Sequence, residues 1–215
     1  AAFKHWIAVP GKGCDVRDRV LYRQDRSRPR SCGSARGSWV SPYDNRRFSL
    51  SSKLDVDHTV PLAEAWGSGA RAWSAAQRRR YANDLHRFTL IAVSASSNRS
   101  KADRDPAEWL PPRRSYACRY LAHWVAVKHR WRLAVDPDER EAIGRRMSSC
   151  SRSSLALPRI AQVAVPAARP GPAPEPGNDP RFSSCAAAKE AGHGPYVRGR
   201  DPEYEWYRDG DGGGT

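Results

Sequence analysis

The sequence predicts an α+β protein in which a two-stranded ββα unit is embedded in a mainly helical domain. Residues 50–60 and 90–93 have the composition of strands, and residues 97–103 follow the second run as a short helix. Residues 157–180 are rich in proline and alanine, with few charges and no periodicity, which predicts a semi-extended linker. We therefore expect a domain over residues 1–154, a linker over 155–180 and a small tail module over 181–215.

The first half of the domain contains clear local signals. Asp15 can cap a helix that runs through about residue 24, because apolar residues recur on one face of that segment. A strand is predicted at 39–43, before the 50–60 strand, with a turn at residues 44–45 between the two. Residues 1–13 show little pattern and are expected to be an extension.

Three further helices are predicted from their first residues. Ser74 and Gln77 have capping-box spacing, which predicts a helix through about residue 85. Ser115 is expected to cap a second helix, in which apolar residues repeat at helical spacing. The third begins after Asp136, where proline and two acidic residues fill the first turn.

The five cysteines stand at positions 14, 32, 118, 150 and 185, and no Cys-x-x-Cys motif occurs. The first four allow three pairings; we favour 14–32 and 118–150, because each pair brackets one structural unit. Buried free thiols are the alternative. Disulfides would require an oxidising compartment. The chain begins with Ala1 rather than methionine, as a processed secretory precursor or a trimmed chain would. No stretch is apolar enough to span a membrane, and we expect a secreted protein.

The net charge is +14, and it is unevenly distributed. Residues 181–215 contain five Lys or Arg and six Asp or Glu, giving −1 and leaving +15 on residues 1–180. A charge of that size favours a polyanionic partner such as nucleic acid. Solubility or an arginine-rich composition is the alternative explanation.

A short motif points to chemistry on nucleic acid. Asp57-His58-x-x-Pro61-Leu62, followed by Asn98-x-x-Lys101, resembles the HNH (ββα-metal) nucleases. Segments 57–66, 81–85 and 98–112 are similar to the secreted, non-specific DNases of that superfamily, which are related to the nuclease domain of GmrSD-type restriction enzymes. The resemblance runs from about residue 13 to residue 150.

The resemblance implies roles for particular residues. Asp57 and Asn98 would hold one divalent metal ion, magnesium or alternatively manganese, and His58 would activate water. Arg87 stands where family members carry an asparagine that braces the loop between the strands. Arg87, Arg99 and Lys101 are the candidate substrate contacts. Asp55 shares a strand face with Asp57 and is either a neighbour of the metal or a solvated carboxylate.

The tail resembles an Excalibur module, a small extracellular calcium-binding unit. The matching residues are Cys185, Ala191, Gly192, Gly194, Pro195, Asp201, Pro202, Tyr204 and the run 209–212. Asp209 and Asp211 would be the calcium ligands. Tyr207 stands where the family's first aspartate would be, and calcium needs about six to eight oxygen ligands. A disordered acidic tail is the alternative.

Together these features predict a secreted, monomeric, metal-dependent endonuclease that hydrolyses DNA with little sequence specificity. The alternative is a non-catalytic basic protein that binds nucleic acid or a cell surface and carries a decayed HNH site. A toxin-like nuclease acting on RNA is a further alternative. Metal-dependent plasmid nicking discriminates the enzyme from the binding protein.

Overall fold

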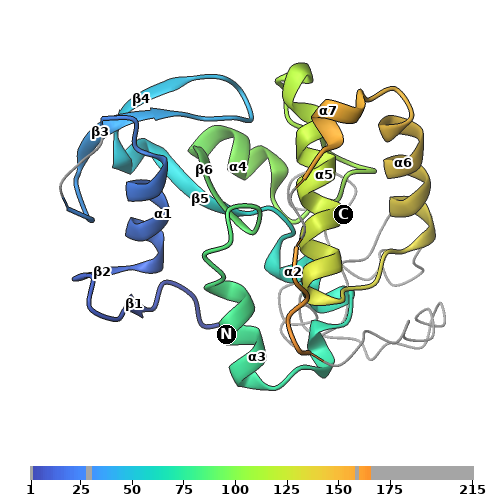
Figure 1. Ribbon diagram of the computed structural model, residues 1–215, viewed down its shortest axis with the longest axis horizontal. Helices are drawn as coiled ribbons and strands as arrows, with labels where there is room; N and C mark the ends of the chain where they lie inside the picture. Colours follow the sequence, from blue (N-terminus) through green and yellow to red (C-terminus); the bar gives the residue numbers. More distant parts are fainter. Residues whose placement is uncertain (1, 28–30, 158–159, 166–215) are drawn as a thin grey trace, which may run out of the picture. The chain divides into compact units, whose positions relative to one another are not determined.

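The computed structural model describes residues 2–27, 31–157 and 160–165, and within these ranges the fold is a mixture of helices and two-stranded sheets (Figure 1). This confirms the α+β class. In chain order the strands and helices are β1 Ala8–Val9, β2 Cys14–Asp15, α1 Val16–Gln24, β3 Arg36–Val40, β4 Arg47–Leu50, β5 Leu54–His58, α2 Leu62–Gly67, α3 Ala75–Ala82, β6 Leu90–Ser94, α4 Ala95–Lys101, α5 Arg114–Trp131, α6 Pro137–Met147 and α7 Arg152–Leu155.

The ββα unit lies at the centre of the described chain. Strands β5 and β6 pair antiparallel, from Leu54 opposite Ser94 to His58 opposite Leu90. Helix α4 follows β6 directly and packs against both strands (Figure 1). It begins two residues earlier than predicted, because the Ser94 side chain accepts a hydrogen bond from the backbone N–H of Ser97.

Local capping explains where several helices begin. The Asp15 side chain caps α1, Ser74 and Gln77 form a capping box on α3, and Asp136 caps α6 ahead of Pro137, so these predictions are confirmed. Helix α5 differs, because it begins at Arg114 without a side-chain cap, and the expected cap Ser115 lies inside its first turn.

The predicted strand over residues 50–60 is divided. Residues 47–50 belong to β4, a 3₁₀ turn over Ser51–Lys53 reverses the chain, and β5 begins only at Leu54. The β4 strand pairs with β3 in a separate hairpin, whose turn contains Asn45 with a φ of 61°. Asparagine tolerates this left-handed conformation better than most residues.

Two hydrophobic clusters hold the described residues together. The smaller one packs α1 against the β5–β6 hairpin, with Val20, Leu54 and Leu90 at its centre. The larger one surrounds α5, where Trp124 and Trp131 are buried, as their helical spacing among apolar residues requires. Among the described residues, no helix is both long enough and apolar enough to cross a membrane.

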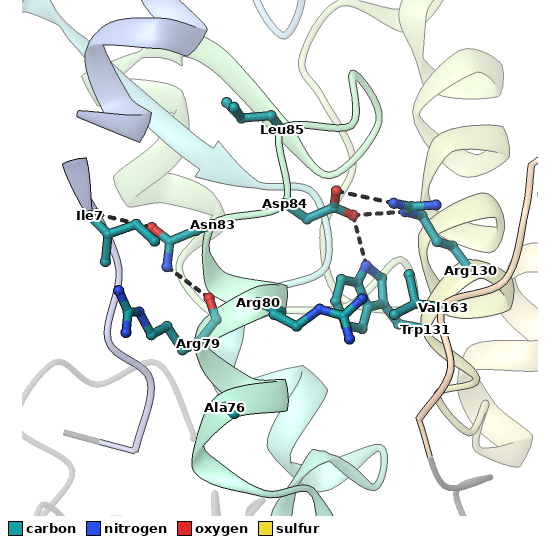
Figure 2. Close-up of a pocket in the computed structure, with 10 residues that line it drawn as sticks. All are labelled: Ile7, Ala76, Arg79, Arg80, Asn83, Asp84, Leu85, Arg130, Trp131 and Val163. Atoms are coloured by element: carbon teal, nitrogen blue, oxygen red, sulfur yellow. Dashed lines mark hydrogen bonds and ion pairs between the residues drawn. The ribbon is translucent and has the colours of Figure 1, made fainter. Parts of the chain in front are cut away.

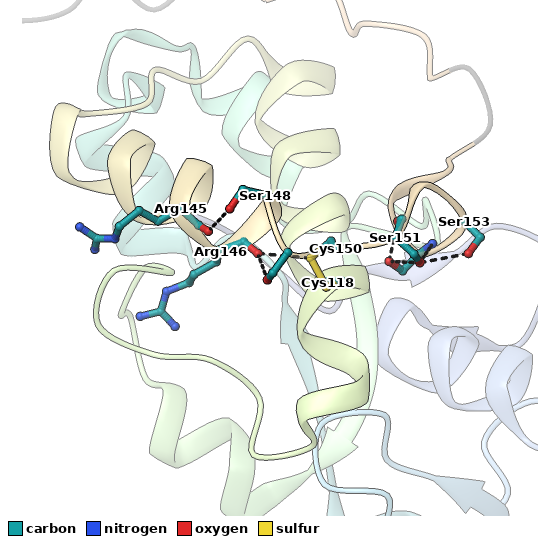
Figure 3. The surroundings of a disulfide bond; sticks show 9 residues. Cys118, Arg145, Arg146, Ser148, Cys150, Ser151 and Ser153 are labelled. Carbon is teal, nitrogen blue, oxygen red and sulfur yellow. Dashed lines mark hydrogen bonds between the residues drawn. A yellow bond between two sulfur atoms is a disulfide. The ribbon is translucent and has the colours of Figure 1, made fainter.

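Both expected disulfides are present. Cys14 pairs with Cys32, and Cys118 of α5 pairs with Cys150, which follows α6. Figure 3 shows the second bond, with the Cys150 sulfur also close to the Arg146 carbonyl at 3.4 Å. The bond therefore fastens the end of α6 to the start of α5, as the spacing of the cysteines predicts.

The predicted linker is wrong for residues 160–165. Val163 donates a backbone hydrogen bond of 2.8 Å to the Arg130 carbonyl, and both Val163 and Val165 are buried in the larger hydrophobic cluster. Helix α7 also crosses the expected boundary at residue 154. A segment rich in Pro and Ala can pack when its few large apolar residues reach a core. The rest of the predicted linker and the tail lie outside the described residues.

Candidate active site

His58 is the last residue of β5, and its imidazole is held on three sides. Its Nε2 lies 3.0 Å from the Ala82 carbonyl oxygen, and the rings of Tyr81 and Trp6 flank it at centroid distances of 6.2 Å and 5.7 Å. Tyr81 is itself fixed, because its hydroxyl donates to the Val60 carbonyl. The imidazole is therefore immobilised in one orientation.

The partner of Nε2 determines the chemistry of this ring. A carbonyl oxygen only accepts hydrogen bonds, so Nε2 must carry the proton. In the neutral imidazole the basic lone pair is then on Nδ1. Burial lowers the pKa of His58 to about 4, against the opposing effect of the hydrogen bond to Ala82. His58 is consequently neutral at pH 7 and able to accept a proton at Nδ1.

The N-terminal segment forms part of this site. The Asn83 side chain accepts from the backbone N–H of Ile7 at 3.1 Å and donates to the Lys4 carbonyl at 2.7 Å, so it holds the chain on both sides of Trp6. Trp6 has a φ of 55°, a left-handed conformation that a bulky residue adopts only when its surroundings impose it. The expectation that residues 1–13 are an extension is wrong for this segment.

Asp57 lies beside His58 on β5 and is almost fully buried. One carboxylate oxygen accepts from the Lys101 ammonium at 2.8 Å, and the other accepts from the Tyr43 hydroxyl at 2.5 Å. Burial raises the pKa of Asp57 above its ordinary value, although the Lys101 ammonium opposes that rise. The carboxylate is thus held rigidly between the strand and helix α4.

Lys101 does not have the predicted position on the surface. Its side chain has no exposed area, and its ammonium also donates to the His58 carbonyl oxygen at 2.9 Å. The ammonium joins Asp57 to the end of β5, so the contacts of Lys101 in this structure are those of a brace between α4 and β5.

Asn98 and Asp55 lie next to each other on the side of β5 that faces α4. The Asn98 amide nitrogen donates to Asp55 at 3.2 Å, and the Arg99 guanidinium lies 4.0 Å from the same carboxylate. Arg99 is 80% exposed and Asp55 33% exposed, so this end of the site is open to solvent.

These side chains have the donors that a hard divalent cation prefers. Asp55 contacts Asn98 and Arg99 of α4, and Asp57 contacts Lys101 of the same helix, so two carboxylates of β5 face the helix that carries the Asn98 amide. Each carboxylate oxygen has two lone pairs, so Asp57 can accept a further partner beside Lys101 and Tyr43. Oxygen ligands that leave room for water suit magnesium. In the described ranges no group of three or more His, Cys, Asp or Glu could hold a metal ion.

Arg87 is exposed, and its guanidinium lies over the Phe88 ring at 4.9 Å. The family resemblance places an asparagine that braces the loop at the position of Arg87. In this structure the backbone carbonyl of Ala82 holds the His58 imidazole instead. A backbone group has no signature in the sequence, which is why the motif alone did not reveal it. The remaining candidate ligands, Asp209 and Asp211, lie outside the described residues.

Two family descriptions and one relative match this chain. Residues 16–146 match the family described as GmrSD restriction endonucleases, C-terminal domain, and residues 182–215 match the Excalibur calcium-binding domain. An uncharacterized secreted protein of Arthroderma benhamiae is 41% identical over 151 residues, covering 69% of this chain and 73% of its own length. No solved structure matches. The secreted relative and the two disulfides confirm the expected extracellular localisation.

Proposed function

The chain belongs to the family of the C-terminal domain of GmrSD restriction endonucleases, and from this premise we propose that it is a secreted, metal-dependent endonuclease. In this proposal it hydrolyses phosphodiester bonds of DNA with little sequence specificity, as a monomer. The observation that supports the proposal best is the fixed orientation of the buried His58, whose Nε2–H is occupied by the Ala82 carbonyl, so that Nδ1 is the basic nitrogen.

His58 is the general base of this reaction. It accepts a proton at Nδ1 from a water molecule, which attacks phosphorus in line with the departing 3′ oxygen and leaves a 5′-phosphate. The Ala82 carbonyl holds the ring in the reactive tautomer and stabilises the imidazolium that forms. A general base in position contributes about 10²–10⁴-fold to a rate.

Asp57 and Asn98 hold the divalent metal, which we expect to be magnesium, with manganese as a substitute. When bound, the cation stabilises negative charge on the departing oxygen. Lys101 and Tyr43 fix the direction of the Asp57 carboxylate, and Asp55 adds a second negative charge next to Asn98. The ligand set is therefore oriented before the metal binds.

The substrate is held mainly through its phosphates. Arg99 is the phosphate contact nearest to Asp55 and Asn98. The exposed Arg87, over the Phe88 ring in the loop before β6, is a second cation for the substrate. Phosphate contacts position a nucleic acid without reading its bases. Low sequence specificity follows from contacts of this kind.

A metal titration tests the ligand assignment. Purified protein should nick plasmid DNA in the presence of magnesium and lose activity with a chelator. Asp57→Ala and Asn98→Ala should require more cation for half-maximal activity, whereas Arg87→Asn should retain the wild-type requirement, since Ala82 supplies the brace. Equal cation requirements in wild type and in both ligand variants would remove Asp57 and Asn98 from the proposed site.

The same assay separates the alternative function. A basic binding protein with a decayed site would bind plasmid DNA and leave it intact with every cation. The Excalibur match adds a calcium site to the proposal, with Asp209 and Asp211 as ligands. Calcium binding to the full chain should then weaken when both are replaced by asparagine.

A further inference from the structure

A recess lies next to the loop that holds His58. Its volume is about 520 Å³, within the range of roughly 300–1,000 Å³ found for ligand sites. Helix α3, the loop after it, the end of α5 and the N-terminal segment all contribute to its walls (Figure 2). The residues that line it are Ile7, Ala76, Arg79, Arg80, Asn83, Asp84, Leu85, Arg130, Trp131 and Val163.

Three consecutive arginines of α3 have different roles here. Arg78 is engaged in the fold, since it donates to the Ala2 and Trp73 carbonyls. Arg79 and Arg80 are exposed and line the recess, and their guanidinium groups form no ion pair within the part of the chain that the structure describes. These two guanidinium groups are therefore available to an anion.

The one carboxylate in the recess does not cancel this charge. Asp84 accepts hydrogen bonds from Arg130 at 2.8 Å and 3.3 Å and from the Trp131 indole at 2.9 Å (Figure 2). It also accepts one from the Thr89 hydroxyl at 3.0 Å. Burial raises its pKa, but these hydrogen bonds outweigh burial and hold the pKa below its ordinary value. Arg130 compensates the charge of Asp84. Arg79 and Arg80 therefore give the lining of the recess a net charge of +2.

The other walls of the recess are apolar. Ile7, Leu85 and Val163 line it from three separate segments, and Arg130 also donates to the Ala161 carbonyl, which fixes the segment that carries Val163. Two cations beside an apolar surface match a ligand with a phosphate and a flat, weakly polar ring. A nucleotide has both parts.

We propose that this recess binds one nucleotide of a single-stranded or locally opened nucleic acid, with its two flanking phosphates on Arg79 and Arg80, whose side chains diverge from α3 (Figure 2), and the base against the apolar wall. The inference rests on the proposed nuclease function and assigns a second point of contact for its substrate. Asn83 and Asp84 directly follow Ala82, whose carbonyl holds His58. The recess is therefore adjacent along the chain to the residue that holds the proposed base.

Binding without cleavage tests this subsite. The probe is a fluorescein-labelled thymidine hexanucleotide, compared with an abasic strand of equal length, and affinity is measured by fluorescence anisotropy in EDTA. Ala76→Trp fills the recess without changing charge. Ala75→Trp is the matched control, because Ala75 is an exposed neighbour on the same helix that does not line the recess. Thermal unfolding of each variant checks that the fold is retained.

We expect Ala76→Trp to weaken hexanucleotide binding about tenfold and to abolish the preference over the abasic strand, while Ala75→Trp keeps both. Arg79→Ala with Arg80→Ala should weaken both strands and lower the salt dependence by about one to two units. The matched pair Arg71→Ala with Arg140→Ala removes the same charge from two exposed positions outside the recess and should have a smaller effect.

Equal affinities for Ala75→Trp and Ala76→Trp would overturn the proposal, and so would equal losses in the two arginine pairs, since charge alone would then explain binding. The outcome is independent of catalysis. If wild-type protein fails to nick plasmid but Ala76→Trp still loses the hexanucleotide, the nuclease proposal fails and the subsite remains. If nicking occurs and the recess variants bind normally, only the subsite fails.

Discussion

Replacing Lys101 with methionine distinguishes a buried brace from a surface contact. The wild-type ammonium has no exposed area and is shared between the Asp57 carboxylate at 2.8 Å and the His58 carbonyl at 2.9 Å. Lys101→Met keeps most of the volume of the side chain and removes the charge. Asp57, with a 6% exposed side chain, would be left as a buried carboxylate that has lost its cation.

Breaking a buried ion pair by removing one partner costs about 3–5 kcal/mol. In a domain of this size each kcal/mol lowers Tm by roughly 2–4 °C, so we expect a decrease of about 6–20 °C. Arg99→Met is the matched control, because Arg99 lies on the same helix, is 80% exposed and approaches Asp55 only at 4.0 Å. An exposed pair contributes at most about 1 kcal/mol, so the control should unfold close to the wild-type temperature.

Urea denaturation and thermal unfolding of both variants at pH 7 measure this difference. Adding Asp57→Asn to Lys101→Met should recover part of the lost stability, because the unpaired carboxylate is then removed as well. If Lys101→Met is as stable as Arg99→Met, the buried pair does not contribute as the structure indicates, and the reasoning about the brace is refuted.

Three further predictions follow from buried contacts. Trp6→Ala should lower turnover about tenfold or more by releasing one face of His58, whereas Trp6→Phe should retain most activity; an unchanged rate in Trp6→Ala would contradict a positioning role. Burial raises the pKa of Glu139 to about 7 from an ordinary 4.5, so its contribution to the free energy of unfolding is complete below pH 4.5 and is lost as pH rises through 7. Glu139→Gln should abolish this pH-dependent loss of stability in urea titrations at several pH values, and a loss that persists in the variant would exclude Glu139 as its source. Ending the chain at residue 157 rather than 165 should lower the free energy of unfolding by about 3 kcal/mol, because it removes the buried Val163 and Val165 and burial of a valine contributes roughly 1.5–3 kcal/mol. Equal urea midpoints for the two lengths would show that Val163 is not part of the core.

Features set by neighbouring residues could be predicted from the sequence. The caps at Asp15, Ser74 and Asp136 depend on side chains reaching backbone groups within one turn, so their spacing suffices. The order of β6 and α4 was also predictable, because an apolar run gives way to a polar helix, although the helix begins two residues earlier than predicted. The disulfides were predictable because each pair closes a loop around one unit.

Features set by distant residues could not be predicted in this way. Lys101 lies in a helix rich in polar residues, and only the packing of α4 on β5 shows that its ammonium is buried. The contact of Trp6 with His58 depends on Asn83, whose amide gives no local signal of its long-range partners. Val163 follows several residues typical of a linker, and its pairing with Arg130 is visible only in three dimensions.

The central claim is that His58 is the base of a metal-dependent nuclease, and the turnover of His58→Ala tests it most directly. With saturating magnesium and plasmid substrate, we expect turnover to decrease about 10²–10⁴-fold with little change in DNA affinity, because many phosphate contacts supply that affinity. His129→Ala, which removes an exposed histidine of α5, should cleave at the wild-type rate. Cleavage by His58→Ala at the rate of His129→Ala would contradict the assignment of the active site.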